Sequence, residues 1–269
     1  MDSVDIAGAF VTARREATAL TDYPGPLPND LDQAYRIQEA AIGLSEDAGR
    51  RIAGWKAGLI APDLRVPGGD ERLVGPIWAD TVRSVSGDST SPELVEGPTM
   101  PVYEHGFAAA EAEFVVRLEV DVVPGTWDAD DAAALPHTVL AGIEIASSPL
   151  VAINDLGPAV TASDFGNNHG LLVGDPIPVG ADDLAGVQVR TEIDGAVVGE
   201  ATGAAIPGGI HTSLAQTLTI LGRRGRTVAA GSLIATGAVT GVHRARVGQR
   251  VAVTFAGVPV LRCRLGAQQ

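Results

Sequence analysis

Residues 107–116, Phe107-Ala-Ala-Ala-Glu111-Ala-Glu113-Phe114-Val115-Val116, predict an apolar strand that carries two acidic side chains. Alternate residues of a β-strand point to the same side of the sheet, so Glu111 and Glu113 are expected to lie side by side. Adjacent carboxylates repel each other unless water or a cation separates them. A solvated strand face is the ordinary interpretation of a Glu-x-Glu pair, but the apolar residues on both sides indicate that this strand is buried.

A third acidic residue lies alone in the apolar stretch Val139-Leu-Ala-Gly-Ile-Glu144-Ile-Ala. A buried carboxylate without a partner costs several kcal/mol or takes up a proton. Convergence of Glu111, Glu113 and Glu144 on one cation would remove both difficulties. An all-oxygen ligand set favours Mg²⁺ or Mn²⁺ over Zn²⁺, and three protein ligands leave coordination positions for substrate and water.

Lys56 is the only lysine among 19 basic residues. A position that keeps lysine in an arginine-rich background is expected to need a compact ammonium group that can lose its proton, although a compositional accident is the alternative. The five histidines show no paired metal-ligand spacing, and Ser147-Ser148 lacks the sequence context of a serine nucleophile.

The composition of the 269-residue chain restricts its possible partners. Its length is sufficient for one or two domains with a well-buried core. The formal net charge of −14 argues against nucleic acid or an anionic membrane as a partner. The single cysteine, Cys263, excludes an internal disulfide framework and a multi-cysteine zinc site. No apolar stretch approaches the roughly 18 residues of a membrane span, and the N-terminus resembles no targeting segment, so a cytoplasmic location is expected.

Hydrophobic spacing predicts helices early in the chain and strands later. The predicted helices cover residues 4–20, from 29 or 30 to about 44, 128–134 and 213–223. Hairpin turns are predicted at Asp194-Gly195 and Ala256-Gly257. This order favours an α+β fold with an antiparallel or mixed barrel or sandwich. No glycine-rich nucleotide-binding loop follows a strand, so nucleotide cofactors are not expected.

Several short motifs follow one another in an order that is informative. They are Asp32-Gln-Ala-Tyr35-Arg-Ile-Gln38, Gly54-Trp-Lys56-Ala-Gly58-Leu, Gly75-Pro-Ile-Trp-Ala-Asp80, Glu111-Ala-Glu113, Glu144-Ile-Ala-Ser-Ser148, the segment from Asp164 to Gly174, and Thr236-Gly-Ala. Over about residues 30–265 the chain resembles the 2-keto-4-pentenoate hydratase and 4-oxalocrotonate decarboxylase group of the fumarylacetoacetate hydrolase superfamily. At the position of the third ligand, this chain has Glu144, which is similar to the hydratase and decarboxylase branch. The carbon–carbon hydrolase branch typically has aspartate at that position.

The resemblance implies a fold, a metal and a class of substrate. The implied fold is a β-roll or distorted barrel, with residues 1–70 as a helical N-terminal segment and residues 71–269 as the catalytic β-domain. The implied metal is Mg²⁺ or Mn²⁺ on Glu111, Glu113 and Glu144. The implied substrate is a small 2-oxo acid or its enol, and self-association into a homo-oligomer is expected.

The resemblance also implies roles for further residues. Lys56 and Asp80 are the expected catalytic residues, and the pKa of Lys56 is expected to fall near a metal. The expected substrate-binding residues are Ser148, Asp164, Phe165, Asn167 and Thr236.

Two departures from the family pattern make the pocket beyond the metal look altered. Pro149 stands where relatives often have arginine, and Asp164-Phe165-Gly166-Asn167 stands where they commonly have Asp-Asn-x-Ser. Phe165 and Asn167 are therefore expected near the substrate tail. Hydration of a 2-hydroxydienoate is the leading hypothesis. Decarboxylation of a 4-oxalocrotonate-type 2-oxo-3-enedioate, a non-catalytic small-acid-binding or partner subunit, and a more remote carbon–carbon hydrolase are the alternatives.

Overall fold

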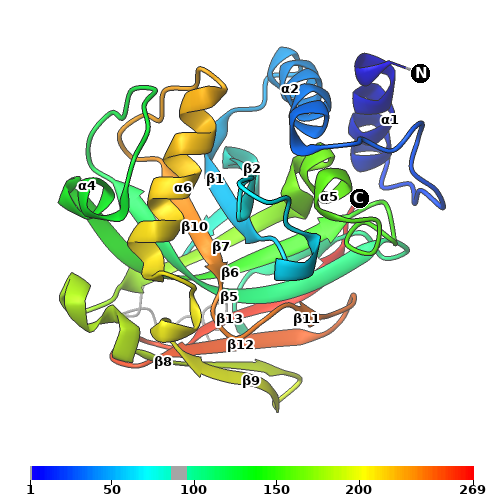
Figure 1. Ribbon diagram of the computed structural model, residues 1–269. Helices are drawn as coiled ribbons and strands as arrows, with labels where there is room; N and C mark the ends of the chain where they lie inside the picture. The colour runs from blue at the N-terminus through cyan, green and yellow to red at the C-terminus, as the bar shows by residue number, and fades with distance from the viewer. Residues whose placement is uncertain (1, 86–95) are drawn as a thin grey trace.

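The computed structural model describes residues 2–85 and 96–269, in which most of the helices lie on one side of a curled sheet (Figure 1). The helices are α1 (Ser3–Arg15), α2 (Leu31–Asp47), α4 (Ala129–Ala134), α5 (Pro158–Ser163) and α6 (Gly209–Arg223). Asp30 caps α2 and Asp128 caps α4, each by accepting a backbone N–H of the first turn.

Eight strands of the described residues form the large sheet, in the order β2-β1-β10-β5-β6-β7-β3, with β11 paired beside β5. Their bounds are β1 (Ile52–Leu59), β2 (Arg72–Trp78), β3 (Val82–Ser84), β5 (Phe107–Leu118), β6 (His137–Ser148), β7 (Asn168–Pro176), β10 (Leu233–Ala238) and β11 (His243–Arg244). The central strands β5 and β6 are almost entirely buried, because other elements cover both faces of the sheet. Their apolar sequences match this environment.

A second, five-stranded sheet lies on the side of the large sheet away from α1 and α2 (Figure 1). Its strands, in spatial order, are β4 (Thr99–Val102), β13 (Leu261–Ala267), β12 (Arg250–Phe255), β8 (Gln188–Ile193) and β9 (Ala196–Thr202). The predicted hairpin between β8 and β9 is confirmed, and Asp194 and Gly195 both have the positive φ of a tight turn. Phe114 and Phe255 join the two sheets, with ring centroids 5.3 Å apart. The predicted α+β class is confirmed.

Helix boundaries differ from the predictions where tertiary contacts override local spacing. Helix α1 ends at Arg15 and not near residue 20, because Leu20 bridges to Leu150 and its N–H bonds to Pro149 O at 2.9 Å. Helix α6 begins at Gly209, four residues before the predicted start, and its N-cap Gly208 is left-handed.

The division at residue 70 stays a prediction, although β1, which precedes it, is a full member of the large sheet. Strand β1 pairs antiparallel with β2 and parallel with β10. Of the helices within residues 2–85 and 96–269, none combines the length and the apolar character that a bilayer span requires.

Candidate metal centre

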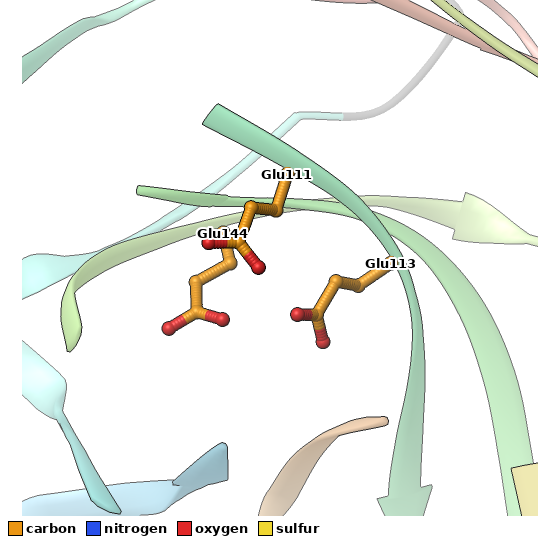
Figure 2. Close-up of side chains that lie close together, drawn as sticks. All are labelled: Glu111, Glu113 and Glu144. Carbon is orange, nitrogen blue, oxygen red and sulfur yellow. The ribbon is translucent and has the colours of Figure 1, made fainter. Parts of the chain in front are cut away.

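Strands β5 and β6 bring three glutamates to one place on the large sheet. Glu111 and Glu113 project from the same face of β5, and Glu144 on β6 lies directly opposite Glu111 in the antiparallel register. Figure 2 shows the three carboxyl groups turned toward a common space. One oxygen from each lies within 4.8 Å of the other two. We call Glu111, Glu113 and Glu144 the carboxylate cluster.

The carboxylate cluster is buried and electrostatically unfavourable by itself. Glu113 and Glu144 are 0% exposed and Glu111 is 5% exposed. Burial raises the pKa of Glu111 to about 7, and Glu144 adds to the shift. Burial raises the pKa of Glu113 well above its usual value, and the neighbouring Glu144 and Glu111 raise it further. Ionisation of the three carboxylates is therefore unfavourable unless a positive charge lies between them.

In Glu113 and Glu144, one carboxylate oxygen accepts a hydrogen bond and the other accepts none. Gly237 N donates to Glu113 Oε2 at 2.8 Å, and Asn168 Nδ2 donates to Glu144 Oε1 at 2.9 Å. Among the described residues, Glu113 Oε1 and Glu144 Oε2 are buried without a hydrogen-bond partner. Buried carboxylate oxygens that accept no hydrogen bond are costly in a native protein, so this set of oxygen ligands fits a hard divalent cation.

Lys56 on β1 reaches the carboxylate cluster from the other side of β10. Its Nζ lies 3.4 Å from Glu144 Oε2 and donates to Gly166 O at 3.2 Å. Burial lowers the pKa of Lys56, but Glu144, Glu111 and Glu113 outweigh burial and raise it to about 12. The fall of this pKa expected beside a bound metal stays a prediction.

A cavity of about 430 Å³ opens beside the cluster. Lys56, Glu111 and Asn167 line it together with apolar residues of β1 and of the turn that follows β1. Asn167 Oδ1 accepts from Lys56 Nζ at 3.4 Å, and its Nδ2 donates to Asn154 at 2.9 Å. The structure therefore places Asn167 at the cavity beside Lys56, and its contact with a substrate tail stays a prediction.

The segment that carries Asn167 is a tight left-handed turn. Phe165, Gly166 and Asn167 have φ values of 56°, 62° and 58°. Left-handed backbone is costly for residues other than glycine and persists only where the surrounding structure fixes it. A Cβ at position 166 would lie 3.1 Å from Lys56 Cδ, so glycine also allows the lysine side chain to pass close to the turn.

A buried ion pair anchors this turn at Asp164. Arg14 of α1 donates to Asp164 Oδ1 at 2.5 Å and to Oδ2 at 2.9 Å, and Ser148 Oγ donates to Oδ2 at 2.6 Å. Arg14 also donates to Asn168 O at 3.1 Å and lies 3.4 Å from Nδ1 of His169. We call Arg14, Ser148, Asp164 and His169 the Arg14 cluster.

Four of the predicted substrate or catalytic residues lie away from the cavity wall. Ser148 and Asp164 belong to the Arg14 cluster. Phe165 is buried against Trp78, with ring centroids 5.4 Å apart. The Thr236 hydroxyl donates to Phe114 O at 2.9 Å, so Thr236 supports the backbone beside Gly237. None of the four is among the described residues that line the cavity.

Asp80 lies on the surface, where it pairs with Arg50 at 2.9 Å, and its side chain is 58% exposed. It too does not line the cavity. Its predicted catalytic role, like the roles predicted for the other site residues, stays a prediction.

Sequence reasoning missed three residues that organise the site: Arg14, Asn168 and Gly237. Arg14 is a lone basic residue on the buried face of α1, and Asn168 directly follows Asn167. Both residues can be noticed in the sequence, but their positions do not indicate which residue each one contacts. Gly237 has φ 111° within an irregular stretch of β10 that aims its N–H at Glu113.

Solved structures share this architecture. 4-Oxalocrotonate decarboxylase from Pseudomonas putida G7, in complex with magnesium and adipate, aligns over 98% of this chain and 97% of its own at 21% identity and a TM-score of 0.80. Fumarylpyruvate hydrolase from Pseudomonas aeruginosa, in complex with Mn²⁺ and pyruvate, aligns over 81% of this chain and 90% of its own at 17% identity and a TM-score of 0.57. No family model matches the chain. The predicted fumarylacetoacetate hydrolase-like fold is confirmed, and identities this low establish the fold alone.

Proposed function

We propose that this protein is a cytoplasmic, metal-dependent lyase acting on a small 2-oxo acid or its dienol, and that it hydrates a 2-hydroxydienoate. The observation that carries the proposal is the meeting of three buried carboxylates with a buried lysine, beside a cavity that Glu111 and Lys56 line. Structural similarity to enzymes crystallised with Mg²⁺ and Mn²⁺ supports the same metals here.

Glu111, Glu113 and Glu144 are the residues that would hold the cation. A divalent cation in this position supplies a Lewis acid that polarises the 2-oxo group of a bound acid. Gly237 N–H and the Asn168 amide keep two of the carboxylates in position. Because these donors come from β10 and β7, the carboxylate oxygens need little reorganisation when a cation arrives.

Lys56 is the residue best placed to hold or deliver a proton. With its pKa raised to about 12, its Nζ is an ammonium group at neutral pH in the cation-free site. An ammonium group lining the cavity can pair with the carboxylate of a 2-oxo acid or donate a proton to the carbon chain. A bound cation would offset the carboxylate charges, so the pKa of Lys56 should then move back toward the range useful in proton transfer.

Decarboxylation of a 2-oxo-3-enedioate is the second candidate, favoured by the TM-score of 0.80 to a 4-oxalocrotonate decarboxylase. A non-catalytic subunit that binds a small acid is a third possibility, carried only by the changed loop sequence at Phe165 and Asn167. Self-association accompanies the proposal, and light scattering coupled to size-exclusion chromatography measures it directly.

A substrate panel separates these candidates. Purified protein with Mg²⁺ or Mn²⁺ is mixed with 2-hydroxydienoates and with a 2-oxo-3-enedioate. We follow the dienol chromophore and released CO₂ separately. Loss of the chromophore without CO₂ supports the hydratase, and CO₂ release supports the decarboxylase. Metal-dependent binding of pyruvate or oxalate without any turnover would identify a non-catalytic binding protein and contradict the proposed reaction.

A further inference from the structure

Two histidines that are 74 residues apart in the chain meet outside the carboxylate cluster. His137 is the first residue of β6 and His211 is the third residue of α6, and we call them the histidine pair. Their Nε2 atoms lie 3.4 Å apart and their ring centroids 5.3 Å apart, so the two nitrogens face each other. Glu144 lies seven residues further along β6 than His137, so roughly 20 Å of strand separates the histidine pair from the carboxylate cluster.

The backbone fixes which nitrogen of His137 can bind a metal. His137 Nδ1 lies 2.7 Å from Leu135 O. A carbonyl oxygen only accepts hydrogen bonds, so Nδ1 carries the hydrogen and Nε2 of the neutral ring presents a lone pair. Histidines that bind metals commonly donate the hydrogen of their other nitrogen to a backbone carbonyl in this way. His137 therefore has the orientation and the tautomer of a metal ligand, with its lone pair on the side of His211.

A left-handed turn places His211 opposite His137. Gly208 and Gly209 have φ values of 74° and 80°, which glycine adopts at little cost. A Cβ at position 208 would lie 2.7 Å from Thr212 Oγ1, and the Thr212 hydroxyl donates to Gly208 O at 2.6 Å. This turn starts α6 at Gly209, so it determines where the side chain of His211 lies.

The distances within the histidine pair fit a shared cation better than a hydrogen bond. Hydrogen bonds donated by N–H groups in proteins are about 2.7–3.2 Å long, which is shorter than the 3.4 Å between the two Nε2 atoms. Zn²⁺ binds imidazole nitrogen at about 2.0–2.1 Å, so tetrahedral coordination places two such nitrogens about 3.3 Å apart and their ring centroids about 5.2 Å apart. The observed 3.4 Å and 5.3 Å agree with this geometry.

An ion can reach the histidine pair from solvent. Both rings are partly exposed, and His211 lines a cavity of about 330 Å³. A tetrahedral ion held by two imidazoles has two further coordination positions, which water or a small ligand can occupy. Imidazole ligands favour Zn²⁺, Ni²⁺ and Cu²⁺, whereas carboxylates favour Mg²⁺ and Mn²⁺. The histidine pair and the carboxylate cluster are therefore expected to prefer different metals.

We propose that His137 and His211 form a second metal site, which binds Zn²⁺ or a similar ion such as Ni²⁺ or Cu²⁺. The bound ion ties the start of β6 to the first turn of α6, and it stabilises the folded chain because only the folded chain brings the two rings together. The proposal goes beyond the proposed function and does not depend on what the carboxylate cluster binds.

Calorimetric titration of the full-length protein with Zn²⁺ tests the proposal, with excess Mg²⁺ present to occupy the carboxylate cluster. We expect a site with a Kd of about 1–100 μM, since the histidine pair supplies half the ligands of a structural zinc site. His137→Gln and His211→Gln should each weaken this binding at least about tenfold. His105→Gln is the matched control, because His105 is exposed and lies outside the pair, and it should leave the affinity unchanged.

Electron paramagnetic resonance of bound Cu²⁺ identifies the ligands without relying on the stability of a variant. In the wild type and in Glu113→Gln, we expect hyperfine coupling to two imidazole nitrogens, which copper on the carboxylate cluster would not show. In His211→Gln this two-nitrogen signal should disappear. A wild-type spectrum without imidazole coupling, or Zn²⁺ binding that is lost in Glu113→Gln but kept in His211→Gln, would overturn the proposal. Neither measurement uses enzymatic activity, so the proposed function is tested separately.

Discussion

Two buried charged groups meet at Asn168, and they differ in how well their charges are satisfied. The side chain of Asn168 donates to Glu144 of the carboxylate cluster, while its carbonyl accepts from Arg14 of the Arg14 cluster. In the Arg14 cluster, both oxygens of Asp164 accept from the guanidinium, and one also accepts from Ser148. In the carboxylate cluster, three acids share one ammonium group, and two oxygens have no hydrogen-bond partner within the described residues.

This difference separates a structural charge cluster from a functional one. A buried ion pair whose hydrogen bonds are complete needs nothing further and holds the surrounding backbone in one conformation. A buried group of like charges is costly until a cation joins it, so its persistence indicates binding. Removing a charge should therefore be costly in the Arg14 cluster and nearly neutral in the cation-free carboxylate cluster.

The largest expected effect is on stability, in Arg14→Met. The substitution leaves Asp164 buried without its partner, so the free energy of unfolding should fall by about 3–5 kcal/mol. Urea denaturation measures the loss. The double variant Arg14→Met/Asp164→Leu should recover part of it, because neither charge is then left alone. A loss below about 1 kcal/mol in Arg14→Met would show that the two clusters do not differ as described.

The next effect is on turnover, in Lys56→Arg. Arginine keeps the positive charge but is larger and does not release its proton at working pH. We expect kcat to fall by about 10²-fold, the usual size of a general acid–base contribution, which corresponds to about 2.7 kcal/mol of activation free energy. Steady-state kinetics measures this, and an unchanged melting temperature serves as the control. Activity within a few-fold of the wild type would mean that Lys56 only balances charge.

Glu113→Gln tests the metal response of the carboxylate cluster. In the wild type, a free Mg²⁺ or Mn²⁺ concentration ten times the Kd should add about 1.4 kcal/mol to the free energy of unfolding, and EDTA should remove it. In Glu113→Gln this response should disappear, while the cation-free stability should be equal to or above that of the wild type. Thermal unfolding with and without metal measures both quantities. A wild-type melting temperature indifferent to metal and chelator would contradict the site.

The smallest expected effect is a pH dependence that arises in the Arg14 cluster. Burial, together with Arg14, lowers the pKa of His169 to about 3. Between that value and the unfolded pKa of about 6.5, the unfolded chain binds a proton that the folded chain does not, so stability is lost as pH falls. From pH 7 to pH 5.5 the stability advantage of the wild type over His169→Gln should shrink by about 1 kcal/mol.

The quantity to measure is the difference in free energy of unfolding between the wild type and His169→Gln. Glu111 changes the stability of each protein in the opposite direction as pH falls when no cation is bound. Its pKa is raised to about 7, so the folded chain takes up a proton there as pH falls. Excess Mg²⁺ in both samples keeps the carboxylate cluster ionised. An advantage that is constant with pH would show that His169 is not held neutral by its surroundings.

Much of the carboxylate cluster could be predicted from the sequence. Glu111 and Glu113 share a face because strand side chains alternate, and Glu144 is conspicuous as one acid in an apolar run. The solitary Lys56 is conspicuous by composition. The cluster of the three acids and the approach of Lys56 to it agree with these predictions.

The Arg14 cluster could not be predicted in the same way. Arg14 and Asp164 are 150 residues apart in the chain, and nothing local to either residue names the other. The contacts of Phe165 and Asp80 likewise could not be predicted from their neighbours in the sequence. The predicted place of Phe165 is at the substrate tail, and its ring packs against Trp78. The predicted role of Asp80 is catalytic, and its side chain lies on the surface beside Arg50.

Features that depend on neighbouring residues follow from the amino-acid sequence alone. They are a buried strand with two glutamates on one face, the Asp-Gly hairpin, and the aspartates that cap α2 and α4. Backbone periodicity and side-chain hydrogen bonds within a few residues fix such features. Three other features arise only when the chain is folded: the strand order that brings Lys56 to Glu144, the ion pair that anchors the left-handed turn, and the apolar wall of the cavity. These depend on how the whole sheet pairs and what covers it, because burial and long-range hydrogen bonding are properties of the assembled core.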